Sequence, residues 1–391
     1  GSPRYKAPRQ RKASRAKAVQ LAQYRDREIV AIGLSENEID ALAGRGYAIT
    51  EQVTVAAVSA QMVRLSVPQG TTLETARADV RAVNATAVAD FNHFYRPQQD
   101  AMCEGEACAA WSQLQWPASA TATAGCGGSV RIGMVDTAVN TDHEALQSAR
   151  VERIDTSARD ARESGAGHGT AVAALLVGAR SSRTPGLLPA AQLIAADPFE
   201  RSGSDERGDV FAIVIAIDAL ASKNVHAINL SFAGPDNDLL DRIVSVVSDR
   251  GIPLIAASGN AGAGSPPLFP AAYPAAIAVT AIDQNQNIYR RAVRGEHIDF
   301  AAPGVNVWTA ASVKGGRPKT GTSFATPFVT AAAALIKAGD AQATPQSISA
   351  KLSTTASDLG DPAKDAVFGH GLIQATGLCG SDPEPLPVSA Q

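Results

Sequence analysis

From residue 128 to residue 282, short and evenly apolar segments that suit strands alternate with segments that suit helices. Strands that are apolar along their whole length, rather than at every second residue, are typical of a parallel sheet buried on both faces. We therefore predict an α/β fold with a doubly wound, mainly parallel sheet flanked by helices. The segments, beginning with a strand and ending with two, are VRIGMVD, TAVAALLVG, AQLIAAD, GDVFAIVIAIDALAS, VHAINLS, LLDRIVSVVSDRG, IPLIAAS and AIAVTAI.

Three polar residues fall at the edge of this sheet where functional groups gather, the carboxyl ends of its strands. Asp136 ends the first apolar strand, His168 lies in GAGHGTAV just before a helix, and Ser323 opens the helix that begins in GTSFATP. Each alone has a simpler interpretation, because aspartate occurs in turns, histidine in loops, and serine at helix N-caps. The three together, in the order Asp, His, Ser, are far more specific than any one of them.

These motifs resemble those of the subtilisin-like serine proteases. The resemblance spans about residues 128 to 376, and it includes further segments of the family in their usual order. It implies a subtilisin-like fold and hydrolysis of peptide bonds without metal or organic cofactor. The further segments are INLSFAGP at 228–235, ASGN at 257–260, FPAAYPAAIAVTAI at 269–282 and FGHGLI at 368–373.

The resemblance also implies a role for each polar residue. Ser323 would be the nucleophile, His168 would accept its proton, and Asp136 would hold the imidazole in the correct tautomer. The Ser323 amide and the Asn260 side chain would stabilise the oxyanion. Alternatively, Asn260 is a turn residue after a strand, since the pair Gly259–Asn260 suits a turn. Pro327 is expected in the first turn of the helix, where a missing N–H leaves nothing unsatisfied.

Substrate binding is implied in the same way. The segment SFAG should form an extended edge to which a substrate backbone adds as a strand, with a specificity pocket between it and the ASGN segment. Leu268 either projects into the floor of that pocket or is an ordinary core leucine, and the sequence leaves both open. The residues expected at this site are Ser231, Phe232, Ala233, Gly234, Ala257, Ser258, Gly259 and Leu268.

Residues 28–96 are predicted to form a small α+β domain. Their pattern reads strand, helix, strand, strand, helix, strand, which is the split βαβ order of ferredoxin-like domains. By resemblance to secreted subtilisin-like enzymes, this domain would be a propeptide that inhibits the enzyme within the chain. Self-cleavage is then expected between about Tyr95 and Ala101. The alternative is an accessory or protein-binding module that is never removed.

Four cysteines bear on the compartment and on the linker between the domains. Residues 97–127 read as a linker on the surface of the neighbouring domain, which would span residues 128–379. We expect Cys103 to pair with Cys108 and Cys126 with Cys379, which requires an oxidising, extracytoplasmic compartment. Free buried thiols are the alternative. Residues 380–391 are expected to form a C-terminal tail.

Charge and composition exclude several partners. A formal net charge of -3 gives no general reason to expect nucleic acid, and the basic run within residues 1–27 is typical of a disordered tail. No segment reaches the length of about 20 apolar residues that spans a membrane. The interval ARSSRTPG lacks acidic and amide side chains, so we expect no calcium there and no metal site.

We expect a monomer. Two rival functions are a non-catalytic binding protein with this fold and a protease whose only substrate is itself.

Overall fold

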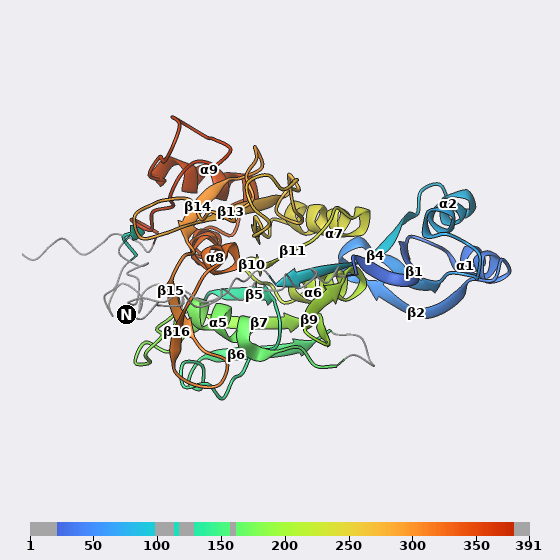
Figure 1. Cartoon of the computed structure of the whole chain (residues 1–391), viewed down its shortest axis with the longest axis horizontal. Coiled ribbons are helices and arrows are strands. Elements are labelled where there is room, and N and C mark those ends of the chain that lie inside the picture. Colours follow the sequence, from blue (N-terminus) through green and yellow to red (C-terminus); the bar gives the residue numbers. More distant parts are fainter. Residues whose placement is uncertain (1–21, 98–112, 117–128, 157–161, 379–391) are drawn as a thin grey trace, which may run out of the picture.

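The computed structural model describes residues 22–97, 113–116, 129–156 and 162–378. Within these ranges the chain forms a smaller and a larger unit along the long axis of the molecule (Figure 1). The smaller unit, drawn in blue, contains residues 24–97, and its last strand runs into the middle of the larger unit. All four cysteines lie outside the described residues, so both disulfide pairings stay predictions.

The larger unit is organised around a seven-stranded sheet in which all neighbouring strands are parallel. All five predicted strands form its centre, and the sheet has two further strands at its edges, β6 and β14. The sequence of β6, RVERID, contains four charged and two apolar residues, because only part of an edge strand is buried. In sheet order the strands are β14 (Phe300–Pro303), β13 (Ala276–Ile282), β12 (Leu254–Ala257), β10 (Ala227–Leu230), β5 (Arg131–Val135), β7 (Gln192–Asp197) and β6 (Arg150–Asp155).

Helices cover both faces of this sheet, which confirms the predicted α/β fold. Met134 and Val135 are neighbours in β5, yet they belong to the cores on opposite faces because successive residues of a strand point to opposite sides. One face carries α5 (Ala166–Val177) and α8 (Thr322–Gly339), and the other carries α6 (Val210–Ala221) and α7 (Asp238–Asp249). A hairpin of β15 (Val307–Ala310) and β16 (Gly316–Lys319) and the helix α9 (Pro345–Thr355) complete this unit.

The smaller unit has the predicted split βαβ order and an antiparallel sheet with strands in the order β2-β3-β1-β4. Its first strand begins at Tyr24, four residues before the start expected from the apolar pattern, because residues 24–27 are polar and contact the larger unit. The elements are β1 (Tyr24–Ile32), α1 (Glu36–Ala43), β2 (Ala48–Val55), the short 3-10 helix η1 (Ala56–Val58), β3 (Ala60–Ser66), α2 (Leu73–Val83) and β4 (Val88–Pro97).

The two faces of the smaller sheet have different partners. One face packs against the unit's own helices, as Leu65 of β3 does against Val80 of α2. The opposite face packs on α6 and α7 of the larger unit, where Met62 shares a core with Phe211 and Leu240. The smaller unit therefore buries an apolar surface against the back of the larger one.

The two units also share strands. β4 pairs antiparallel with β9 (Asp205–Asp209) on one side and with β11 (Phe232–Ala233) on the other. β8 (Phe199–Ser202) extends this sheet beyond β9. Figure 1 shows β4 reaching between these elements of the larger unit. A strand of the smaller unit thus lies on the edge that the sequence assigns to a substrate.

Two further observations concern the linker and the membrane. Of the predicted linker, residues 113–116 are described; Leu114 and Trp116 are buried in the core of the larger unit, and the Trp116 Nε1–H donates to the Leu187 carbonyl at 3.2 Å. Within the described ranges, none of the helices combines the length and apolarity that a bilayer crossing requires.

Candidate active site

Asp136 and His168 meet at the carboxyl end of β5. Asp136 follows β5 directly, and its Oδ1 lies 2.6 Å from Nδ1 of His168. Because a carboxylate only accepts hydrogen bonds, Nδ1 carries the proton and Nε2 of the neutral ring is left as the acceptor. Both side chains are fully buried, and Nε2 has no hydrogen-bond partner in the described part of the chain. The imidazole is therefore held in one tautomer with its basic nitrogen unoccupied.

His168 lies inside α5, as the third residue of the helix, and not before the helix as the sequence suggested. The residue after His168, Gly169, packs directly against the chain that follows β5. A Cβ atom on Gly169 would lie 2.1 Å from the Thr137 carbonyl oxygen. The Gly169 N–H donates to the Thr137 hydroxyl at 2.9 Å, and the Thr137 N–H donates to Asp136 Oδ1 at 2.7 Å. This close approach brings the imidazole within reach of the carboxylate.

Ser323 is the second residue of α8 and is fully buried. The next residue, Phe324, places its ring 5.3 Å from the His168 imidazole, centroid to centroid, so the helix start faces the Asp136–His168 pair. The Ser323 hydroxyl donates to the Ser231 carbonyl at 3.0 Å. The helix is entered through Gly321, whose φ of 151° is unfavourable for other residues. The start of α8 therefore lies beside the Asp136–His168 pair, and the catalytic roles of the three residues stay a prediction.

Pro327 is the sixth residue of α8, so its placement in the first turn was wrong. At this position a proline N–H is missing that would otherwise bond the carbonyl of Ser323, four residues earlier. The Ser231 hydroxyl donates to that carbonyl instead, at 3.0 Å, and itself accepts from the Asn229 amide at 2.8 Å. The proline therefore makes room for a hydrogen bond between α8 and the predicted substrate edge.

Asn260 lies beside the start of α8. Its Oδ1 accepts from both the backbone N–H and the hydroxyl of Thr322, each at 3.1 Å. The same hydroxyl accepts from the Gly259 N–H at 3.1 Å. Because Oδ1 is bound on the α8 side, the amide orientation is fixed and Nδ2 projects from the opposite end of the group. Thr322 is a positioning residue that the sequence reasoning missed, although it lies within the GTS motif.

The predicted substrate edge is occupied by the chain itself. Phe232 and Ala233 pair with Pro97 and Arg96 of β4, while β9 pairs with the other side of β4. Gly234 is bonded through its backbone to Phe269, so it does not extend the strand. β9 was not among the predicted site residues, because its polar sequence, DERGD, carries no apolar pattern.

Tyr95 fills a pocket against Gly234. A Cβ atom on Gly234 would lie 2.5 Å from the Tyr95 ring, so only glycine leaves room for the ring. The Tyr95 ring also packs edge-on against Phe232 at 5.8 Å between centroids. Burial raises the pKa of the Tyr95 phenol well above its usual value. The bound strand is thus anchored by one buried aromatic side chain.

The segment around the predicted specificity pocket is also formed. Ala257 ends β12, and the following Ser258 donates its N–H to Val279 at 3.0 Å. Gly259 has a φ of 101°, and a Cβ atom there would lie 2.5 Å from Cδ1 of Leu268. Leu268 is half-buried and packs against Gly259, next to Asn260. Its position is compatible with a pocket wall, and its role there stays a prediction.

Lys319 is a charged residue near the site, and the sequence reasoning missed it as it missed Thr322. It lies on β16, with Nζ 5.9 Å from the centre of the Phe324 ring. Burial, with a contribution from Arg317, lowers the pKa of the Lys319 ammonium, and the charge of Asp136 opposes this shift. No motif marks Lys319, because it approaches through a hairpin far from β5. Among the described residues, no group of three or more His, Cys, Asp or Glu side chains could hold a metal ion.

Comparison with known proteins decides the family. A model of the subtilase family, peptidase S8, matches residues 127–371 of this chain. The chain belongs to the subtilase family. Two curated subtilases illustrate the similarity. Subtilisin Savinase of Lederbergia lenta is 34% identical over 251 residues, covering 64% of this chain and 90% of that protein. The Minor extracellular protease Epr of Bacillus subtilis (strain 168) is 33% identical over 211 residues, covering 53% of this chain and 32% of that protein.

Solved structures share the fold. Fervidolysin from Fervidobacterium pennivorans, described as a keratinolytic enzyme related to subtilisin, has a TM-score of 0.78 at 17% identity and covers 93% of this chain and 62% of its own. A mutant of the protease domain of PatA has a TM-score of 0.57 at 24% identity, covering 65% of this chain and 94% of its own. The fervidolysin match therefore takes in the smaller unit as well as the larger one.

Proposed function

We propose that this subtilase is a serine endopeptidase in which Asp136, His168 and Ser323 form the catalytic triad. The observation that carries the proposal is the buried contact of 2.6 Å between the Asp136 carboxylate and the His168 imidazole, with Nε2 open at the start of the Ser323 helix. A non-catalytic binding protein would have no need to bury the Asp136 carboxylate against an imidazole whose basic nitrogen is unoccupied, because burying a charged carboxylate is costly unless the charge is used or compensated.

The reaction follows from these groups. Rotation of the Ser323 side chain away from the Ser231 carbonyl brings its hydroxyl to His168 Nε2. As Oγ attacks the peptide carbonyl carbon, Nε2 takes the hydroxyl proton, and Asp136 stabilises the imidazolium that forms. The proton then passes to the leaving amine as the C–N bond breaks. Water attacks the resulting ester with His168 again as base, which releases the acid product and restores Ser323.

The negative oxygen of the tetrahedral intermediate needs donors that are already in position. We assign this role to the backbone N–H of Ser323 at the start of α8 and to Nδ2 of Asn260. The α8 start favours negative charge because its backbone N–H groups point outward at the positive end of the helix dipole. Thr322 supports the second donor by binding Asn260 Oδ1 through two hydrogen bonds of 3.1 Å.

The smaller unit is proposed as an intramolecular inhibitor. β4 lies between β9 and β11, which is the position that an extended peptide takes when it adds to the edge of a sheet. A strand held there excludes other substrates. We propose that the precursor cuts itself between about Tyr95 and Ala101.

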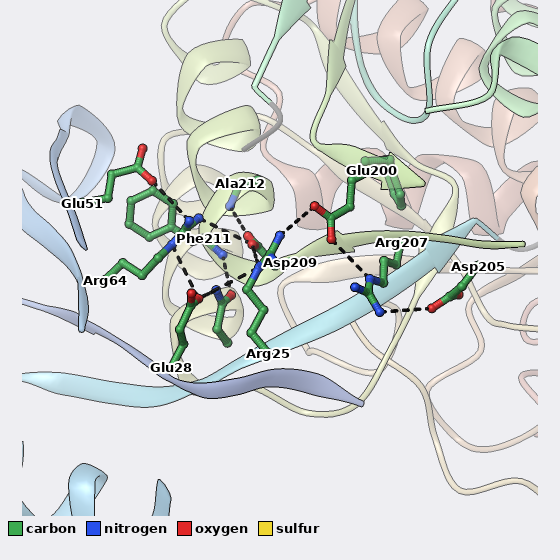
Figure 2. A network of polar contacts seen from close by, with 12 residues as sticks. Arg25, Glu28, Glu51, Arg64, Glu200, Asp205, Arg207, Asp209, Phe211 and Ala212 are labelled. Carbon is green, nitrogen blue, oxygen red and sulfur yellow. Dashed lines mark hydrogen bonds and ion pairs between the residues drawn. The ribbon is translucent and has the colours of Figure 1, made fainter. Parts of the chain in front are cut away.

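Ion pairs join the smaller unit to the β8–β9 hairpin (Figure 2). Arg25 donates to Asp209 at 2.5 Å and to Glu200 at 2.9 Å, and Arg64 approaches Asp209 at 3.5 Å. Burial alone would lower the pKa of Arg25, but the Asp209 and Glu200 carboxylates raise it above its usual value. The Asp209 carboxylate also caps α6 by accepting from the Ala212 N–H at 2.9 Å. These contacts supplement the apolar interface and support a long-lived inhibited state.

A second polar cluster joins β4 to the start of α7. The Asp90 carboxylate accepts from the Asp238 N–H at 3.0 Å and from Arg77 at 3.0 Å. Nδ1 of His93 lies 2.8 Å from the Asn237 amide nitrogen, so the neutral ring accepts this bond. Burial lowers the pKa of His93. The charged groups that face it are Asp90 and Asp236, which raise the pKa, and Arg77, which lowers it further.

A fluorophosphonate probe tests the catalytic assignment. The probe should label the wild-type chain covalently, label the Ser323→Ala variant not at all, and label the matched Ser353→Ala variant of α9 like the wild type. Absence of labelling in every preparation, including one incubated to allow processing, would favour the non-catalytic binding protein. Labelling without turnover of any added peptide would instead indicate a protease that acts only on itself.

A time course tests self-processing separately. Wild type should be cut between about Tyr95 and Ala101, as shown by N-terminal sequencing, while Ser323→Ala stays intact. Equal cleavage in both chains, or none in either, would refute self-processing without touching the labelling result. We also propose an extracytoplasmic location, supported by the extracellular relative, and cell fractionation checks it.

A further inference from the structure

We propose that Asp205 forms a subsite for an arginine side chain of the substrate, at the substrate residue that pairs with Ala233. This inference rests on the proposed protease function and on β4 as a stand-in for a bound peptide. In the structure, Arg96 of β4 pairs with Ala233, and its guanidinium binds Asp205 through Nε at 2.9 Å and through Nη2 at 3.1 Å.

The space between β9 and β11 that β4 occupies, called the β4 slot below, fixes the position of this arginine side chain. A peptide between β9 and β11 is bonded through its backbone on both sides, so its register determines which residue faces Ala233. Successive side chains of a strand point to opposite faces. Tyr95 therefore packs on Gly234, whereas Arg96 turns the other way and reaches Asp205 at the start of β9.

The geometry of the contact suits arginine better than lysine. Two nitrogens of the planar guanidinium contact the two oxygens of one carboxylate, an arrangement that a single ammonium does not reproduce. The pair is also largely shielded, with side-chain exposures of 20% for Arg96 and 10% for Asp205, so solvent screens it less than an open surface pair.

Asp205 is left short of positive charge when β4 departs. Its remaining cationic partner among the described residues is Arg207, whose Nη1 lies 3.5 Å away and whose Nε binds Glu200 at 3.3 Å (Figure 2). The hairpin of residues 199–209 carries four carboxylates and two arginines. An incoming arginine therefore replaces the charge that Arg96 supplied.

Other carboxylates of the hairpin do not belong to this subsite. Asp209 and Glu200 bind Arg25 of β1, and Asp209 also faces Arg64 of β3. A single extended peptide in the β4 slot carries neither of those strands. The subsite is thus one carboxylate that recognises one side chain, and the pairs that Arg25 and Arg64 make with Asp209 and Glu200 hold the smaller unit in place.

The experiment compares matched fluorogenic peptides that copy residues 92–101 and differ only at the position of Arg96, which is Arg, Lys or the neutral isostere citrulline. The enzyme is the full-length chain after processing, with active sites counted by the fluorophosphonate. We expect kcat/KM to be about five- to tenfold higher for Arg than for citrulline, as for a partly shielded, charge-assisted pair. In Asp205→Asn this ratio should fall to about one, while Glu152→Gln, which removes a surface carboxylate paired with Lys223, should keep the wild-type ratio.

A salt titration of the wild type provides a readout without mutation, in case Asp205→Asn fails to fold. The preference for Arg over citrulline should shrink between about 0.15 M and about 1 M salt, because the Debye length falls from about 8 Å to about 3 Å. Equal rates for Arg and citrulline, or a preference that survives in a folded, labelled Asp205→Asn, would overturn the subsite and leave the protease function standing. No labelling and no turnover in any preparation would overturn both.

Discussion

Replacing Gly169 by alanine should inactivate the enzyme by separating two atoms. Gly169 has an ordinary helical conformation within α5, so alanine would by itself favour the helix by about 1 kcal/mol. The new Cβ, however, would lie 2.1 Å from the Thr137 carbonyl oxygen and 2.8 Å from that of Ala138. Both are backbone atoms and cannot rotate away, so the start of α5 must move.

The size of that movement follows from the distances. Restoring even a tight contact of about 3.2 Å requires a shift of at least about 1 Å away from the chain after β5. The His168–Asp136 contact of 2.6 Å would then lengthen to about 3.6 Å, which is no longer a hydrogen bond. Misplacement of this size costs about 100-fold in rate, and loss of the correct imidazole tautomer costs up to about 10,000-fold. Strain in the core should also lower the free energy of unfolding by about 1–3 kcal/mol.

A neighbouring glycine provides the control. A Cβ on Gly167, in the same helical turn, would meet only the Ser312 Cβ at 3.6 Å, an ordinary contact. Gly167→Ala should therefore keep its activity and match or exceed the wild type in stability. Fluorophosphonate labelling rates and thermal unfolding of the three chains would be compared. If Gly169→Ala labelled as fast as Gly167→Ala, the close approach of α5 would not be what positions His168.

Three further predictions concern the oxyanion donor and the interface. Asn260→Ala should lower kcat by about 100- to 1,000-fold, as loss of such a donor does in subtilisin. The fluorophosphonate should still label Ser323 in this variant, but slowly. An unchanged kcat would show that Asn260 is not part of the oxyanion hole. Arg64→Gln should weaken the binding of the smaller unit, because the Arg64 guanidinium contacts Asp209 and lies 4.4 Å from the centre of the Phe211 ring. On size-exclusion chromatography, processed wild type should therefore release the smaller unit more slowly than the processed variant. In the folded chain the pKa of His93 lies below its unfolded value of about 6.5. As the pH falls below about 6.5, the unfolded chain takes up the proton first. The contribution of His93 to stability is therefore complete above about pH 7 and is lost at lower pH. The unfolding midpoint of the Ser323→Ala chain should therefore drop less between about pH 7.5 and about pH 5.5 when His93→Gln is added, and an equal drop in both would exclude His93.

Much of the architecture could be predicted because burial on both faces leaves a direct mark on the chain. The five central strands are mostly apolar and do not alternate with polar residues, and each of them is present in the structure. The split βαβ order of the smaller unit was equally visible, since its strands and helices bury one regular stripe each. The strands β6 and β9 were not predicted, because they are partly exposed and their charged residues hide the period.

The site was partly predictable from the direction of the strands. Parallel strands end at one edge of the sheet, so Asp136 after β5 and the starts of two helices were expected to converge. Asn260 and Leu268 were found through the family's motifs and not through any pattern of their own. Their neighbours in the fold, Thr322 and Gly259, show why they lie there.

Contacts between distant segments were beyond the sequence. Nothing in the local pattern shows that Lys319 approaches Asp136, or that a carbonyl left free by Pro327 is bound by Ser231. The occupation of the predicted substrate edge by β4 joins Arg96 to Ala233, and the ion pair of Arg96 with Asp205 joins residues 109 positions apart. Short-range periodicity records how deeply each residue is buried, whereas the identity of the partner across a strand or an ion pair depends on packing that only the folded chain produces.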